Sequence, residues 1–194
     1  MNVHLIQLLR EQLNCPPLQK IDPNTQDTAA TGAELYADKL MQAVIPSVLT
    51  GFYKLTKSKE GAALFLRGNI STSWATMLFG DNQPIVISHI ADYSGAEKAE
   101  VIRQIEEAAN ETAGLITANA SPGTIPTEEQ IILFMKDQRS DILHYLPAAL
   151  QIGGLPDDST LDDHTNKMDG PVSGLMHSIE KAFSGAQSMG ETKK

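Results

Sequence analysis

Aromatic side chains, cysteine and long hydrophobic runs are all scarce in this sequence, and each shortage narrows what the protein can be. Aromatic residues make up 5% of the chain although 41% is hydrophobic, so a core must consist mainly of aliphatic side chains and Met, which favours helices. Cys15 is the only cysteine and cannot form an internal disulfide, which fits a reducing compartment. No stretch approaches the roughly 18 apolar residues of a membrane span, and the N-terminus lacks the basic start of a secretory signal. We therefore expect a cytoplasmic protein without a membrane span.

Basic residues are also scarce. The sequence has 15 Lys and Arg against 24 Asp and Glu, which gives a net charge of −9. A nucleic-acid-binding protein needs a clustered basic surface to contact phosphates. The composition therefore argues against a nucleic-acid partner.

Apolar residues recur at helical spacing along much of the chain. The four sets are Val3, Ile6, Leu9 and Leu13, with Leu5 and Leu8 beside them; Val101, Ile105, Ala108, Thr112 and Ile116; Ile131, Ile132, Met135, Ile142, Leu143 and Leu146; and Val172, Leu175, Met176, Ile179 and Phe183. Each set predicts an amphipathic helix with one buried face. The first helix is expected to end at Pro16 and Pro17, because proline cannot continue a helix. We expect an acidic connector over residues 156–171 and a disordered tail over residues 184–194.

Helix-start signals suggest an internal duplication. Thr31-Gly-Ala-Glu34 and Ser94-Gly-Ala-Glu97 both match a capping box, and Thr127-Glu-Glu-Gln130 is a weaker version. Pro16 and Pro84 each open a short apolar stretch upstream of the first two boxes, so both copies predict a short helix, a proline-started helix and a capped longer helix. The alternative is chance similarity in an apolar helical chain. We predict an all-α, multihelical fold with degenerate repeats at residues 1–68 and 69–120 and a helical extension over residues 121–194, packed as one or two compact units.

A proline and a glycine recur in two apolar runs, IPSVLTGF at residues 45–52 and LPAALQIGGL at residues 146–155. Proline costs about 3 kcal/mol inside a helix but little in its first turn. Pro46 and Pro147 are therefore expected to start a helix or to mark a kink, and Pro46→Ala to change stability without abolishing a reaction. Gly51 and Gly153 are expected to let a neighbouring helix approach closely.

Two stretches carry a family resemblance. Residues 78–109, LFGDNQPIVISHIADYSGAEKAEVIRQIEEAA, have a Phe-Gly turn before a short helix and a Ser-Gly turn that opens the next one. Residues 43–65, AVIPSVLTGFYKLTKSKEGAALF, have a Pro-x-x-Leu-x-Gly segment followed by a glycine-containing turn. Over residues 1–116, and also 127–155, the chain resembles the bacterial YidB-like domain of unknown function, although residues 106–111 are polar and lack the family's second proline. The resemblance implies a multihelical fold and carries over no catalytic residue.

Histidines paired with acidic residues are the candidate metal ligands. His89 and Asp92, Asp141 and His144, and His177 and Glu180 are each three residues apart, which places both side chains on one helical face. Each pair is half a site, and such pairs commonly support an exposed helix. The acidic connector around His164 lacks the glycine and glutamate of an EF-hand loop. We keep Asp141, His144, His164, His177 and Glu180 as metal candidates, but we expect no metal and no cofactor.

Aromatic residues gather within thirty positions at Phe52, Tyr53, Phe65, Trp74 and Phe79. They are candidates for an apolar groove that binds a partner helix or a lipid-like ligand. The competing interpretation, which we favour, is that they form the core, because large apolar side chains are usually buried.

The sequence contains no catalytic motif that withstands scrutiny, so an enzymatic function is not expected. We expect a non-catalytic helical interaction or scaffold module with a protein partner. A metal-dependent hydrolase that uses His and Asp residues between positions 141 and 177, and a carrier of an apolar ligand, are the alternatives. The oligomeric state is left open.

Overall fold

The architecture is mainly helical in the part of the chain that the structure describes. This computed structural model describes residues 4–21, 39–68, 72–150 and 152. Its α-helices are α1 (Leu5–Gln12), α2 (Lys39–Leu55), α3 (Lys59–Leu66), α4 (Trp74–Phe79), α5 (Gln83–Ser94), α6 (Lys98–Ala120) and α7 (Glu128–Tyr145), and the 3-10 turns are η2 (Gly80–Asn82) and η3 (Ala148–Leu150). The prediction of an all-α, multihelical fold is confirmed. No helix formed by the described residues is both long and apolar enough to cross a membrane.

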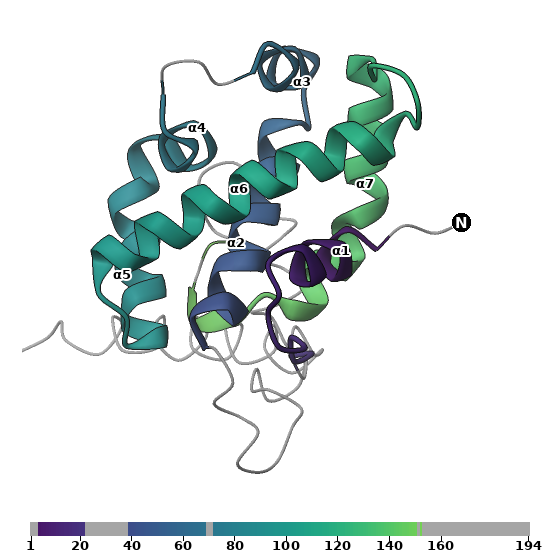
Figure 1. Ribbon diagram of the computed structural model, residues 1–194. Coiled ribbons are helices and arrows are strands. Elements are labelled where there is room, and N and C mark those ends of the chain that lie inside the picture. Colours follow the sequence, from purple (N-terminus) through teal and green to yellow (C-terminus); the bar gives the residue numbers. More distant parts are fainter. Residues whose placement is uncertain (1–3, 22–38, 69–71, 151, 153–194) are drawn as a thin grey trace, which may run out of the picture.

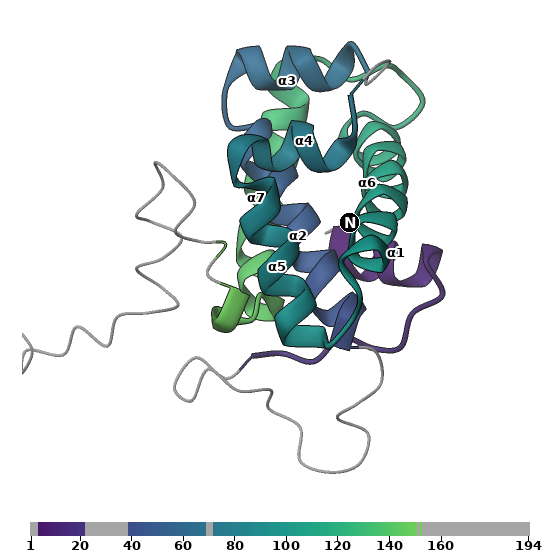
Figure 2. The same cartoon turned by 90° about the vertical axis from the view of Figure 1, so that its left-hand side faces the viewer.

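Helix α2 lies at the centre of the fold. Every residue from Met41 to Phe52 is buried, because other helices pack around this mainly apolar segment. In Figure 1, α6 crosses in front of α2, with α5 near one end of α6 and α7 near the other. Figure 2 shows α1 and α6 together along one side of the molecule, and these two helices pack against each other. Buried residues from α1 to η3 form one continuous hydrophobic core.

Two small polar side chains inside α2 bond to the helix itself. The hydroxyl of Ser47 donates to the carbonyl oxygen of Ala43 at 2.5 Å, and that of Thr50 donates to the carbonyl oxygen of Pro46 at 2.7 Å. These bonds satisfy the hydroxyl donors without a partner from another helix. Polar residues can therefore lie in the most buried helix.

The two prolines occupy different positions. Pro46 lies inside α2, so it does not start a new helix there. Pro147 lies two residues after the end of α7 and directly before η3, so it does lie at the start of a 3-10 helix. The close approach expected at Gly51 is confirmed, because a Cβ atom at this position would lie 2.9 Å from the Cβ of Leu78 on α4. Gly153 lies outside the described residues.

The helix caps agree only in part with the three capping boxes expected from the sequence. Thr127 and Gln130 form a complete capping box at the start of α7, so the weakest of the three signals is confirmed. The box expected at Ser94 and Glu97 is wrong, because Ser94 is the last residue of α5 and Glu97 is the N-cap of α6 without a side-chain bond. Gly95, with φ of 75°, ends α5 in the left-handed conformation. Ser94 therefore still belongs to α5 and does not serve as the N-cap of α6. The box expected at residues 31–34 lies outside the described residues.

The segment after α1 is not helical, and this corrects a second expectation. Asn14, with φ of 51°, ends α1 before the prolines: its N–H donates to the carbonyl of Glu11, and that of Cys15 donates to the carbonyl of Arg10. This pattern is a Schellman motif. Residues 15–20 then run without helix, whereas Pro84 lies in the first turn of α5 as predicted. The two proposed repeats therefore differ in the element that Pro16 was expected to start.

Candidate functional site: a groove between α3, α4 and α6

The metal candidates within the described residues do not converge. Asp141 was paired in the sequence with His144, yet its Oδ2 lies 2.5 Å from Nδ1 of His4, next to α1. The side chain of His144 is exposed. His89 also has a structural partner, because its Nδ1 lies 2.8 Å from the carbonyl oxygen of Leu150. Across the described parts of the chain, no three His, Cys, Asp or Glu side chains are grouped closely enough to hold a metal ion. His164, His177 and Glu180 lie outside those parts.

The five aromatic residues singled out from the sequence have separate positions. Phe52, Phe65, Trp74 and Phe79 are buried, and Tyr53 is half-buried. The ring of Phe52 meets the ring of Phe65 edge to face at a centroid distance of 5.9 Å and that of Trp74 at 5.2 Å. Such contacts are favourable for aromatic pairs. Most of this aromatic set therefore belongs to the core.

Phe65 and Trp74 also face a groove on the surface. We name it the α3–α6 groove, because it lies between the end of α3, the start of α4 and the second half of α6, and its volume is about 710 Å³. Its lining residues are Phe65, Leu66, Gly68, Trp74, Ala113, Gly114, Thr117, Ala118, Ser121, Gly123, Thr124 and Ile125. None of these side chains carries a charge. The groove is therefore suited to apolar contacts, and the polar groups of its lining side chains are hydroxyls and the indole N–H of Trp74.

Helix α6 fixes the aromatic floor of the groove. The carboxylate of Glu106 accepts hydrogen bonds from the backbone N–H groups of Trp74 and Ala75, both at 2.9 Å, and so caps the start of α4. One turn further along α6, Asn110 Oδ1 accepts a bond from the indole Nε1–H of Trp74 at 2.7 Å. Trp74 is only 8% exposed, so its ring is held between these bonds and Phe52. This arrangement gives the groove a rigid floor.

Small residues on α6 form one wall of the groove. Ala113, Gly114, Thr117 and Ala118 lie on neighbouring turns, and the last three are exposed. A Cβ atom at Gly114 would meet nothing within 4 Å. Because no long side chain stands out from this wall, another backbone could approach it closely.

The turn after α6 forms the end of the groove. The hydroxyls of Ser121 and Thr124 are 2.6 Å apart, and the N–H of Thr124 donates to the carbonyl oxygen of Ser121. Gly123 has φ of 80°, which favours glycine. The next residue is Ile125, whose side chain is 86% exposed at the rim of the groove. An isolated exposed apolar residue is ordinary, but this one borders an uncharged groove.

Sequence reasoning found only part of this site. It singled out Phe65 and Trp74, but it assigned no role to Glu106, Gly114 or Ile125. A glutamate and an asparagine four residues apart on one helix predict that they bond the start of another helix only when that helix start is already known to lie beside them. The chain matches no family model, no curated protein and no solved structure.

Proposed function

We propose that this protein is a non-catalytic interaction module that binds an apolar helix of a partner protein in the α3–α6 groove. The observation that carries the proposal is the uncharged lining of a groove of about 710 Å³ over a fixed aromatic floor. An amphipathic helix commonly binds by laying its apolar face into a groove of this kind. The resemblance to the YidB-like family supplies no residue roles, so the proposal depends on the groove alone.

The shape of the groove favours a helix over a small ligand. Gly114, Thr117, Ala118 and Ile125 are all exposed along its length. Sites for small molecules usually bury 70–90% of the ligand surface. A groove whose wall and rim lie open to solvent matches an elongated partner that stays partly exposed. The carrier of an apolar ligand is therefore the second candidate, and the test below separates the two.

Site-specific photo-crosslinking in native cells tests this proposal. A photoreactive residue at position 125 is expected to give one defined protein adduct. The same residue at position 85 is the matched control, because Ile85 is also an exposed isoleucine but lies on α5, away from the groove. Thr117→Arg places a charge on the groove wall and should abolish the adduct at position 125.

Three results would overturn the proposal. Equal adducts at positions 125 and 85 would mean that the groove is not selective. An adduct that survives Thr117→Arg would mean that the partner does not enter the groove. Lipid crosslinked at position 125, or lipid that copurifies with the protein in native mass spectrometry, would favour the carrier instead.

A further inference from the structure

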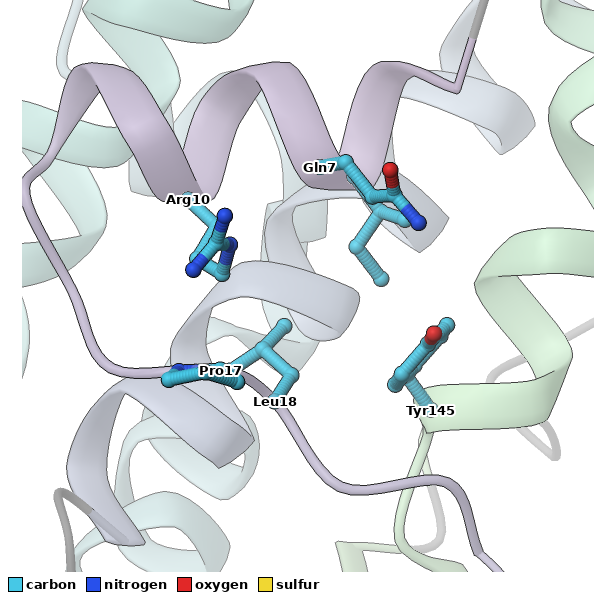
Figure 3. Close-up of a pocket in the computed structure, with 6 residues that line it drawn as sticks. Gln7, Arg10, Pro17, Leu18 and Tyr145 are labelled. Atoms are coloured by element: carbon cyan, nitrogen blue, oxygen red, sulfur yellow. The ribbon is translucent and has the colours of Figure 1, made fainter.

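A second pocket lies between α1, the segment that follows it and the end of α7 (Figure 3), and it differs in chemistry from the α3–α6 groove. We name it the α1–α7 pocket. It is lined by Ile6, Gln7, Arg10, Pro17, Leu18 and Tyr145, and its volume is about 240 Å³. In Figure 3, Gln7 and Arg10 extend from α1 on one side, Pro17 and Leu18 lie opposite, and Tyr145 lies at the end of α7. Three separate segments of the chain therefore meet around this pocket.

The walls of this pocket combine an apolar surface with one cationic group. Pro17, Leu18 and the ring of Tyr145 supply apolar contacts, and the guanidinium of Arg10 supplies a positive charge and several N–H donors. The carboxamide of Gln7 adds a further donor. The chain has a net charge of −9, so the positive charge of this arginine is opposite in sign to the charge of the protein as a whole.

The guanidinium of Arg10 is not needed to cap its own helix. The carbonyls of Arg10 and Glu11 at the end of α1 already accept from the N–H groups of Cys15 and Asn14, both at 3.0 Å. The ionic partner of Arg10 among the described residues is Glu11, at 3.1 Å, and that carboxylate is 62% exposed. An exposed ion pair of this kind contributes about 0–1 kcal/mol. A ligand carboxylate could therefore replace Glu11 at little cost.

We propose that the α1–α7 pocket binds a small monocarboxylate with an apolar body. The carboxylate pairs with Arg10, whose planar fork of donors matches a carboxylate in two-point hydrogen bonding. The apolar body packs against Pro17, Leu18 and Tyr145. A volume of about 240 Å³ is smaller than the usual pocket for a drug-sized molecule, but larger than the cavity of about 150 Å³ that accommodates benzene. A single ring or a short aliphatic chain therefore matches the available space.

Titration of the full chain with benzoate, followed by two-dimensional NMR of the backbone amides, tests the proposal. We expect saturable shifts confined to residues 6–18 and the end of α7, with a dissociation constant on the order of 1 mM, as small ligands allow. Benzamide has the same ring without the charge and should bind at least about ten-fold more weakly. Benzylamine, which carries the opposite charge, should not bind at this pocket.

Variants connect the binding to Arg10. Arg10→Gln should weaken benzoate binding at least about ten-fold, because it removes the charge and keeps part of the side chain. Arg103→Gln is the matched control, since Arg103 is an exposed arginine on α6 away from this pocket, and it should leave benzoate affinity unchanged. Glu11→Gln removes the competing carboxylate and should tighten binding by about two- to five-fold.

The proposal is overturned if benzamide binds as well as benzoate, because the arginine would then have no role. It is also overturned if the two arginine variants weaken binding equally, or if benzoate gives no saturable shifts in the intact chain. The benzamide comparison uses the unaltered protein, so it decides the question even if Arg10→Gln reduces stability. None of these results bears on the α3–α6 groove, which shares no residue with this pocket.

Discussion

Replacing each of three helical glycines by alanine should raise the free energy of unfolding at one site and lower it at the other two. This contrast tests the packing directly. An alanine Cβ at Gly114 would meet nothing within 4 Å, one at Gly51 would lie 2.9 Å from the Cβ of Leu78, and one at Gly61 would lie 1.7 Å from the carbonyl oxygen of Leu55. In a helix interior, alanine is favoured over glycine by about 0.8–1 kcal/mol. Gly51 and Gly114 share this helical gain, Gly61 lies in the first turn of α3, and the three sites differ in steric cost.

The size of each effect follows from what the new methyl group meets. Gly114→Ala has no steric cost and should raise the free energy of unfolding by about 1 kcal/mol. At Gly51 the contacted atom is a Cβ, which cannot rotate away, so α4 must shift; an overpacking cost of about 2 kcal/mol leaves a net loss of about 1 kcal/mol. At Gly61 the contacted atom belongs to the backbone at the end of α2, and we expect a loss of about 3 kcal/mol or more.

Urea unfolding followed by circular dichroism at 222 nm measures all three variants on one scale. The midpoints should fall in the order Gly114→Ala, wild type, Gly51→Ala and Gly61→Ala, with similar slopes. The reasoning is refuted if Gly51→Ala is as stabilising as Gly114→Ala, because α4 would then not lie against that face of α2. A loss of stability in Gly114→Ala would likewise show that the wall of the α3–α6 groove is covered.

Further substitutions test the caps and one electrostatic pair. Glu106→Ala removes two hydrogen bonds at the start of α4, leaves the Ser73 cap in place and should lower the free energy of unfolding by about 1–2 kcal/mol. Glu107→Ala, at an exposed neighbour, should change it by less than about 0.5 kcal/mol in urea unfolding. Gln42→Leu leaves three backbone groups without a partner and should cost about 2–3 kcal/mol in the same assay; no change would show that water replaces the amide. The hydrogen bond from Arg103 lowers the pKa of Glu100, so Arg103→Gln should raise that pKa in a carbon-13 NMR titration, and an unchanged value would contradict the pairing. Because the pKa of Glu100 is lower in the folded state, the pairing stabilises the fold above the ordinary glutamate pKa, and this contribution is lost as pH falls through the lowered value.

Helical periodicity predicted the faces of the long helices well. The stripe expected on α6, from Val101 to Ile116, is fully buried, because five apolar or small residues at this spacing leave only one face for the core. The buried positions Ile131, Met135 and Ile142 on α7 were predicted in the same way. Burial of a continuous stripe is a local property of the sequence, so it can be found without knowing the neighbouring helices.

Helix caps could not be predicted as well, because some compete with a neighbouring local signal and others depend on elements that are distant in sequence. The box at Ser94 failed because Gly95 ended the preceding helix within the same few residues. The segment after Pro16 is not helical, and the side chain of Gln42 bonds both the N–H and the carbonyl oxygen of Gln19 there, at 2.7 and 3.0 Å. A side-chain amide that bonds to the backbone in this way replaces the hydrogen bonds that a helix would provide. The sequence near Gln19 does not predict this pairing.

Some helix ends are capped by residues that are distant in sequence, and these contacts show which parts of the chain pack together. The first N–H of α1, at Leu5, donates to Oε1 of the buried Gln138 on α7 at 2.9 Å. At the other end of α7, the carbonyl of His144 accepts from the N–H of Ile21, and the carbonyl of Tyr145 accepts from the amide of Gln42. Each partner thus satisfies groups that would otherwise be orphaned at a helix terminus. The described residues of α1, α2 and α7 therefore complete each other's helix ends. Together with the continuous core, these contacts place α1, α2 and α7 in one packed body, whatever the origin of the repeated pattern in the sequence.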